Sequence, residues 1–302
     1  MNRKYLNFVM IGVAAALGAG VYYGAQKKAV APKPPLTALN TATIHTLTIE
    51  NQGKTLKLER SKHGWQFTAP FRAAANDANV ASILSVAATP CERELPLKGL
   101  KLAELGLDPP HYSVTFDTEK VQIGETEPLK YRRYALVGGH VCLISDPSAP
   151  GLGSENYANL VSAQLVPPGP TLVKIEIPGY TATFDAGAKS WSLSPAGTGL
   201  APDAAQKLAD AWQGAHALWN TLSPATPDAH DEIATLAFSD GSSVHFSVTA
   251  HKPQLKLVRA DLGIAYAVSP AEEDKLLKPA PAKTKTSAAK HSAASKNASL
   301  SR

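Results

Sequence analysis

An uncharged run near the start of the chain constrains its fold more than any other feature. Residues 6–25 read LNFVMIGVAAALGAGVYYGA and hold no charged side chain. Because a helix rises 1.5 Å per residue, a helix of this length spans about 30 Å, the thickness of the hydrocarbon core of a bilayer. The residues that follow are polar enough to remain in water. We therefore expect residues 1–28 to form an N-terminal transmembrane anchor.

The residues around this run predict its orientation. Arg3 and Lys4 precede it and Lys27 and Lys28 follow it, so the balance of flanking charge decides little. A short basic segment followed at once by an apolar run is typical of an export signal. We expect a single-pass membrane protein with its amino terminus inside and the rest of the chain exported. The run is longer than the apolar core of a signal peptide, which favours retention over cleavage near residues 18–20.

Four small residues recur within the predicted anchor. Gly12, Ala16, Gly20 and Gly24 are spaced by four and would share one face of a helix. In lipid such a face allows a second helix to approach closely. The alternative is that glycine and alanine are simply common in export segments.

The positive charge of the chain is concentrated at its end. The formal net charge is +5, and residues 279–302 carry five basic residues and no acid. The remainder is therefore neutral overall, which argues against a folded nucleic-acid-binding surface. Residues 279–302 are rich in lysine, alanine and serine and are expected to be a disordered basic tail.

The chain has two cysteines, Cys91 and Cys142. In an exported protein such a pair either forms one disulfide or packs as two unpaired, small apolar side chains. The sequence leaves both readings open, because it does not supply the distance between the two Cα atoms.

The rest of the chain repeats one order of elements at a spacing of about 125 residues. Each copy is predicted to contain a hairpin, a strand with a tryptophan, a helix and about four further strands. In the first copy these are strands 44–50, 54–60 and 64–67, a helix capped by Asn76, a helical turn over 102–110, and strands 112–117, 120–123, 131–137 and 140–145. In the second they are strands 171–177, 180–184 and 190–193, a helix from Pro202, strands 232–238, 243–249, 254–259 and 264–268, and a closing helix Pro270–Leu277. The inner face of the helix from Pro202 is expected to carry Ala205, Leu208, Ala209, Trp212 and Trp219.

This order predicts an α+β fold with two similar units, each an antiparallel sheet covered by a helix. We expect a proline-containing spacer at 29–41, the first unit at 42–147, a linker at 148–170 and the second, diverged unit at 171–278.

The first unit carries a set of motifs that resembles a known family. They are the tryptophan strand at 64–67, Leu102-Ala103-Glu104-Leu105-Gly106-Leu107-Asp108-Pro109, Val121-Gln122-Ile123-Gly124 and the aromatic strand at 131–134. This order resembles the bacterial domain-of-unknown-function family 4340. One departure is Ala75-Asn76-Asp77, where members commonly place a proline before the capping acid. The resemblance implies a single-anchor envelope protein with an accessory or scaffolding role, in some members beside ABC-type transporters, and it supplies no catalytic residues.

No motif in the sequence predicts catalysis, a metal site or a cofactor. The nine histidines lack metal-site spacing, and the pairs Glu92 with Glu94 and Glu125 with Glu127 fit solvated turns. Arg132 and Arg133 lie among aromatic residues, but a strand would turn them to opposite faces. We therefore expect a non-enzymatic protein whose partners are the membrane and an envelope or transporter protein. The alternative is a periplasmic module that binds a ligand or cell-wall glycan.

Overall fold

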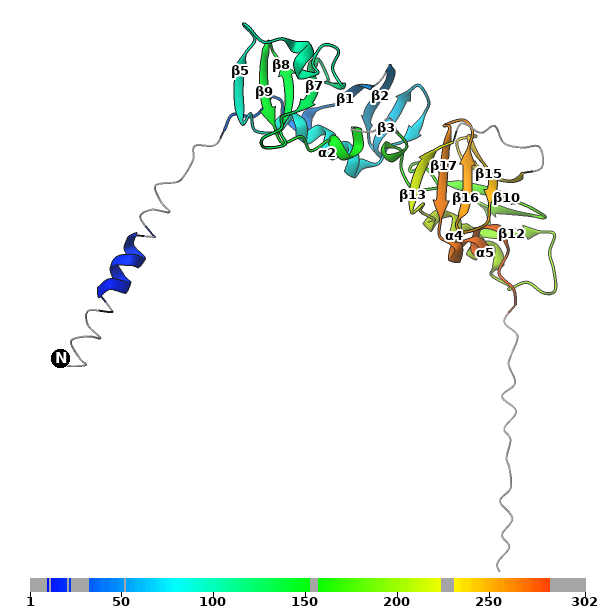
Figure 1. Cartoon of the computed structure of the whole chain (residues 1–302). Helices are drawn as coiled ribbons and strands as arrows, with labels where there is room; N and C mark the ends of the chain where they lie inside the picture. Colours follow the sequence, from blue (N-terminus) through cyan, green and yellow to red (C-terminus); the bar gives the residue numbers. More distant parts are fainter. Residues whose placement is uncertain are drawn as a thin grey trace, which may run out of the picture.

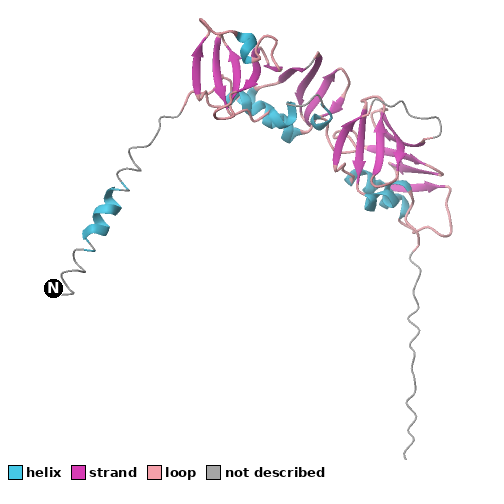
Figure 2. Cartoon of the chain, in the orientation of Figure 1, coloured by secondary structure: helices cyan, strands magenta, loops and turns pink. Residues whose placement is uncertain are grey.

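The computed structural model describes Met10, residues 12–20, Tyr22 and residues 33–51, 53–152, 157–223 and 231–282. These residues form a mixed α+β structure with two antiparallel sheets and few helices (Figures 1 and 2). This confirms the predicted fold class with its two sheet units.

The first sheet has nine strands in the order β4-β3-β2-β1-β6-β7-β8-β9-β5. In chain order they are β1 (Thr46–Asn51), β2 (Lys54–Ser61), β3 (Gly64–Ala69), β4 (Ala73–Ala74), β5 (Arg93–Pro96), β6 (Tyr112–Phe116), β7 (Glu119–Thr126), β8 (Arg133–Val137) and β9 (His140–Ile144). The other elements of this half are η1 (Thr41–Thr43), α2 (Asp77–Ala88) and η2 (Leu102–Leu105). Alternate side chains of β1 and β2 are buried, as their sequence pattern predicts.

The second sheet has eight strands in the order β12-β11-β10-β14-β15-β16-β17-β13. In chain order they are β10 (Leu172–Ile177), β11 (Tyr180–Asp185), β12 (Ser190–Ser194), β13 (Trp219–Leu222), β14 (Glu232–Phe238), β15 (Ser243–Ala250), β16 (Leu255–Arg259) and β17 (Ile264–Val268). The helices of this half are α4 (Ala204–Gly214) and α5 (Pro270–Leu277), and both lie beside the sheet in Figure 1.

The two sheets share one strand topology. Without β4, the first order becomes β3-β2-β1-β6-β7-β8-β9-β5, and the second order matches it strand for strand in chain position. In both halves the strand after the helix, β5 or β13, crosses to the far edge and pairs with the last strand of its sheet. The two units therefore share the same strand order, including this crossing.

The helix in each half forms where the sequence predicts it. Asn76 accepts hydrogen bonds from the amides of Ala78 and Asn79, which caps the start of α2. Val80, Ile83, Leu84 and Ala87 form its buried stripe. In the second half α4 buries Trp212, whose indole nitrogen donates to the Leu276 carbonyl at 3.0 Å.

The prediction for Trp219 is wrong. Its seven-residue spacing from Trp212 fits a helix, but α4 ends at Gly214 and Trp219 is the first residue of β13, where 46% of its surface is exposed. The chain is extended before it, because the Ala217 amide donates to the Ala163 carbonyl and the Leu218 amide to the Ala267 carbonyl. Tertiary hydrogen bonds override the helical period here.

The chain from Lys33 onward is packed, not a free spacer. Leu36 and Thr37 are buried, and the Leu36 amide donates to the Thr89 carbonyl at 2.8 Å. The Cys91 amide donates in return to the Pro34 carbonyl at 2.9 Å. The part of the predicted spacer that the structure describes therefore belongs to the first unit, while residues 29–32 lie outside the described residues.

The predicted linker joins the two units closely. It contains α3 (Ala149–Leu152) and η3 (Tyr157–Leu160); residues 153–156 between them lie outside the described residues. On the first unit, Leu160 accepts from the Asn76 amide and the Ser162 amide donates to the Ala74 carbonyl beside β4. On the second, the Leu165 amide donates to the Ala215 carbonyl just before β13. Residues 160–165 thus lie between an edge of each sheet.

A buried asparagine completes this junction. The Nδ2 atom of Asn220, on β13, donates to the carbonyl of Val161 at 3.0 Å and lies 3.3–3.4 Å from the carbonyls of Ser162 and Ala158. The hydroxyl of Tyr157 also donates to the Leu262 carbonyl, and its ring packs against Phe71 of the first unit. These contacts make the linker a structural part of both units.

The predicted anchor is described only in part. Gly12, Ala16 and Gly20 lie in a helical stretch over residues 12–20, and Gly24 lies outside the described residues. Over the portion of the chain that the structure describes, no helix has the length and apolar character needed to cross a membrane. Most of the predicted tail, residues 283–302, also lies outside the described residues.

Candidate functional site

A polar groove of about 650 Å³ opens on the first unit. Its walls are the turn between β1 and β2, which includes Lys54, and the loop that follows η2, which includes Pro109 and His111. Glu50 and Ser113, on the neighbouring strands β1 and β6, lie between the two walls. We refer to this space as the η2 groove.

The turn that follows η2 and the strand β7 build one wall of the η2 groove. Gly106 ends η2 in the left-handed conformation at φ 62°, which glycine adopts without strain. The turn then packs directly on β7 at Gly124, where an added Cβ would lie 2.2 Å from the Leu105 carbonyl oxygen. The Leu-Gly-Leu-Asp-Pro stretch and the Ile123-Gly124 pair are therefore two sides of one close backbone contact.

The charged side chains of the η2 groove are paired. Glu50 accepts hydrogen bonds from Lys120 at 2.6 Å and from the Ser113 hydroxyl at 2.7 Å. Glu125 contacts the Nε2 atom of His111 at 2.8 Å. The bond from Lys120, aided by Ser113, holds the pKa of Glu50 below its usual value, and His111 lowers the pKa of Glu125 in the same way.

These pairings limit the chemistry of the η2 groove. A general acid at neutral pH needs a carboxyl group with a raised pKa, whereas both carboxylates here have lowered ones. Neither carboxylate is therefore set up to act as a general acid at neutral pH.

A second groove, of about 790 Å³, lies beside the helices of the second unit. It runs between α4 and α5 and is closed by residues 278–281, which pair with the loop before α4 through the amides of Ala201 and Ala282. Leu208 and Ala211 form an apolar floor, and ion pairs such as Lys275 with Glu272 lie at the rim. An apolar floor with a charged rim is typical of a surface that binds a peptide or helix.

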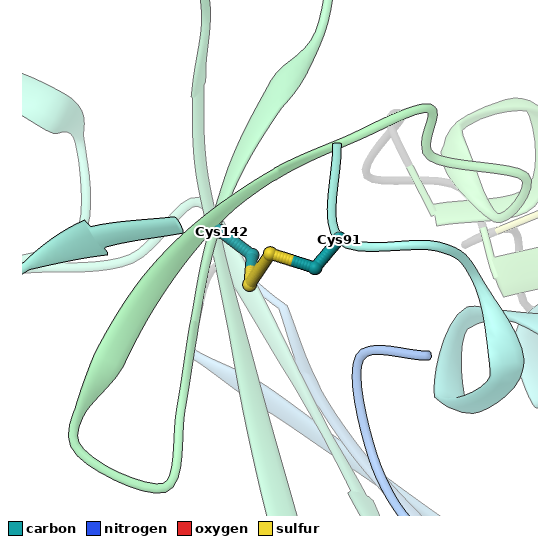
Figure 3. The surroundings of a disulfide bond; sticks show 2 residues. All are labelled: Cys91 and Cys142. Atoms are coloured by element: carbon teal, nitrogen blue, oxygen red, sulfur yellow. A yellow bond between two sulfur atoms is a disulfide. The ribbon is translucent and has the colours of Figure 1, made fainter. Parts of the chain in front are cut away.

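The structure joins Cys91 and Cys142 in a disulfide with a Cα–Cα distance of 5.4 Å (Figure 3). The bond links the segment between α2 and β5 to the middle of β9. Cys91 is also the residue that binds the Pro34 carbonyl, so the disulfide lies beside the point where the described chain enters the first unit.

The predicted basic and aromatic strand begins at Arg133 in the structure, and both of its arginines have partners within the first unit, whereas Tyr131 lies in the turn before it and is exposed. The guanidinium of Arg133 lies 5.6 Å from the ring centre of Tyr112, and Arg132 lies 3.7 Å from Glu92. Tyr112 donates to Asp146, which also accepts from the Ser148 hydroxyl at 2.7 Å. Burial, with Asp146 adding to it, raises the pKa of Tyr112 and keeps its hydroxyl protonated. Arg132 and Arg133 therefore have different partners and do not form one patch with each other.

One member of each acidic pair noted in the sequence forms an ion pair with a basic residue. Glu92 binds Lys33, and Glu125 binds His111. Within the described ranges no group of three or more histidine, cysteine or acidic residues is arranged to hold a metal ion. Neither groove was predicted from the sequence, because each is formed by segments that are distant in the chain. For the η2 groove, the glycine of the turn after η2 is the feature of the sequence that could have indicated it.

Comparison with known proteins gives no relative. No family profile matches the chain, no curated protein matches it, and no solved structure matches it.

Proposed function

We propose that this chain is a membrane-anchored envelope protein with a non-enzymatic, accessory or scaffolding role. Residues 6–25 would act as an uncleaved signal anchor in the bacterial inner membrane, with both sheet units on the periplasmic side. The length and lack of charge of this run support the anchor. The disulfide supports export, because such bonds persist in oxidising compartments and are rare in the cytosol.

The observation that carries the scaffolding role is the junction between the units. Residues 160–165 hydrogen-bond to both sheets, and Asn220 binds the same segment from the second unit. A body joined in this way holds two binding surfaces at a constant separation, which a flexible linker would not do. The two grooves lie in different units, so one copy of the chain would present them together.

The partner that we propose is an integral envelope protein, such as a component of an ABC-type transport assembly. This part of the proposal comes from the family resemblance of the first unit. The balanced charge of the chain outside its basic tail supports a protein partner over nucleic acid.

Fractionation and co-purification test the proposal. The full chain is expected in the carbonate-resistant membrane fraction, and protease added outside the inner membrane is expected to reach both units. A variant in which residues 6–25 are replaced by an unrelated transmembrane helix is the matched control. A partner recovered in constant ratio with both versions supports scaffolding by the folded units. Recovery of the mature chain in the cytosol would refute the location, and the lack of any partner in several mild detergents would refute the role.

The second candidate function is a periplasmic module that binds a polar ligand or glycan. The size and paired charges of the η2 groove favour it. Binding of purified wall fragments by the native chain, with loss of binding in Lys54→Glu, would support it over the scaffold.

A further inference from the structure

We propose that the turn between β7 and β8 is a second membrane contact, which dips into the lipid headgroup region next to the anchor. This turn, here called the hairpin tip, consists of Glu127, Pro128, Leu129, Lys130, Tyr131 and Arg132. The inference rests on the proposed anchor and adds a function for a surface of the folded part.

The hairpin tip presents two large apolar side chains to solvent. Leu129 is 85% exposed and Tyr131 is 83% exposed, the highest values among the large hydrophobic residues that the structure describes. Both belong to one six-residue turn, and apolar side chains that are exposed together are more informative than ones scattered singly over a surface. Neither of them packs on the first unit.

The backbone holds these side chains outward. The Glu127 amide donates to the Arg132 carbonyl at 2.6 Å, and the Tyr131 amide donates to the Glu127 carbonyl at 3.1 Å. Tyr131 lies at φ 54°, in the left-handed region that non-glycine residues seldom adopt. The tip is therefore closed by its own hydrogen bonds, and the exposure of Leu129 and Tyr131 follows from a defined turn.

The hairpin tip also lies where the chain arrives from the predicted anchor. Glu92 pairs with Lys33, at the beginning of the packed chain, and lies 3.7 Å from the guanidinium of Arg132. In Figure 1 the described chain enters the first unit beside β5, on the side of the sheet that carries β9 and β8. The carboxylate of Glu92 thus contacts both Lys33, where the described chain enters the first unit, and Arg132, at the base of the hairpin tip.

Chain length keeps this end of the molecule close to the bilayer. Eight residue steps separate Ala25, the end of the apolar run, from Lys33. A fully extended chain covers at most about 3.5 Å per residue, so Lys33 lies no more than about 28 Å from the end of the anchor. Arg132, at the base of the hairpin tip, shares the partner Glu92 with Lys33, so the tip extends from this same end of the first unit.

The composition of the tip fits a lipid surface. Tyrosine is enriched at the level of the headgroups, where its ring is half in apolar surroundings and its hydroxyl remains wet. Leucine adds apolar area, and Lys130, exposed beside both, is attracted to anionic headgroups. Arg132 and Lys33 add two cations next to Glu92, so the charge near the tip does not oppose an anionic bilayer.

Fluorescence quenching of the full chain in vesicles tests the inference. Tyr131→Trp adds a tryptophan at the tip, and Ile233→Trp, at a position 55% exposed on β14 of the second unit, is the matched control. Each is reconstituted in phosphatidylglycerol–phosphatidylcholine vesicles with or without brominated lipid, and the native chain supplies the background of its four tryptophans. Leu129→Trp repeats the test if Tyr131→Trp does not fold.

We expect the added emission at position 131 to shift to the blue and to lose intensity in brominated lipid, while that at 233 does neither. If the chain floats with the vesicles but position 131 is quenched no more than 233, the inference is wrong and the anchor stands. If the chain does not float, both the anchor and the tip contact are wrong. Quenching that is absent in vesicles, with a blue shift only after envelope proteins are added, would assign the tip to a protein partner and overturn the membrane contact.

Discussion

Loss of the Cys91–Cys142 disulfide is expected to destabilise the first unit strongly. The bond connects residues separated by 51 positions and encloses β5, η2 and β6 to β8. In the chain-entropy description, a closed loop of about 50 residues lowers the entropy of the unfolded chain by about 14 cal/mol/K, which is about 4 kcal/mol at 25 °C. A typical domain has a free energy of unfolding of about 5–15 kcal/mol, so the expected loss is a large share of the total.

Urea unfolding of the full chain, followed by fluorescence, measures this loss. Three samples are compared: the oxidised chain, the reduced chain and the double variant C91A/C142A. The reduced chain keeps both sulfur atoms, so it separates loss of the covalent link from loss of packing. Cys142 is 1% exposed, and we expect the double variant to be less stable than the reduced chain by the additional cost of a small cavity.

The result that would refute this reasoning is specific. If reduction lowers the free energy of unfolding by less than about 1 kcal/mol, the loop does not constrain the unfolded chain as described. A loss of about 4 kcal/mol in the reduced chain, with the variant at or below it, supports the argument.

Three further perturbations test other parts of the structure. Gly124→Ala places a methyl group against the η2 turn and is expected to lower the free energy of urea unfolding by about 3 kcal/mol. The control Gly214→Ala, whose new methyl group meets no atom within 4 Å, should not lower it. Equal stability of the two variants would contradict the close contact. Asn220→Leu removes the hydrogen-bond donor at the junction between the units and should lower the free energy of unfolding by about 1–3 kcal/mol. The control Gln206→Leu, at an exposed position, should change it little. An unchanged urea midpoint in Asn220→Leu would show that the junction does not depend on Asn220. Burial raises the pKa of Tyr266 to about 12, so on raising the pH the unfolded chain loses this proton before the folded chain does. The free energy of unfolding should therefore fall as the pH rises above 10, and that of Tyr266→Phe should fall less steeply. Identical pH profiles for the two proteins would exclude this cause.

Local patterns predicted most of the individual elements because their signals are short in range. Alternating apolar residues placed β14 and β17 at their observed bounds, and Pro270 with the residues after it placed α5. The side chain of Asn76 caps a helix through its own neighbours, so its role is visible without tertiary structure.

The misses share one physical cause. β5 and β13 are four-residue strands at sheet edges, and each is extended only because it pairs with a strand far along the chain. Trp219 was placed on a helix for the same reason, since the hydrogen bonds that keep its segment extended come from Ala163 and Ala267. Neither groove has a pattern of its own, because the walls of each come from segments brought together by the sheet order.

The sequence by itself determined the α+β class, the repeated order of elements and the start of α2 at its Asn76 cap, because these follow from periodicity and from residues that act on their neighbours. It left open whether Cys91 and Cys142 form a disulfide, and it predicted only a linker over residues 148–170. Tertiary structure alone decided that the cysteines meet, that residues 160–165 lie between two sheet edges, and that Leu129 and Tyr131 remain uncovered beside Lys33. The physical reason is distance along the chain: such contacts depend on which strands become neighbours, and no local pattern carries that information.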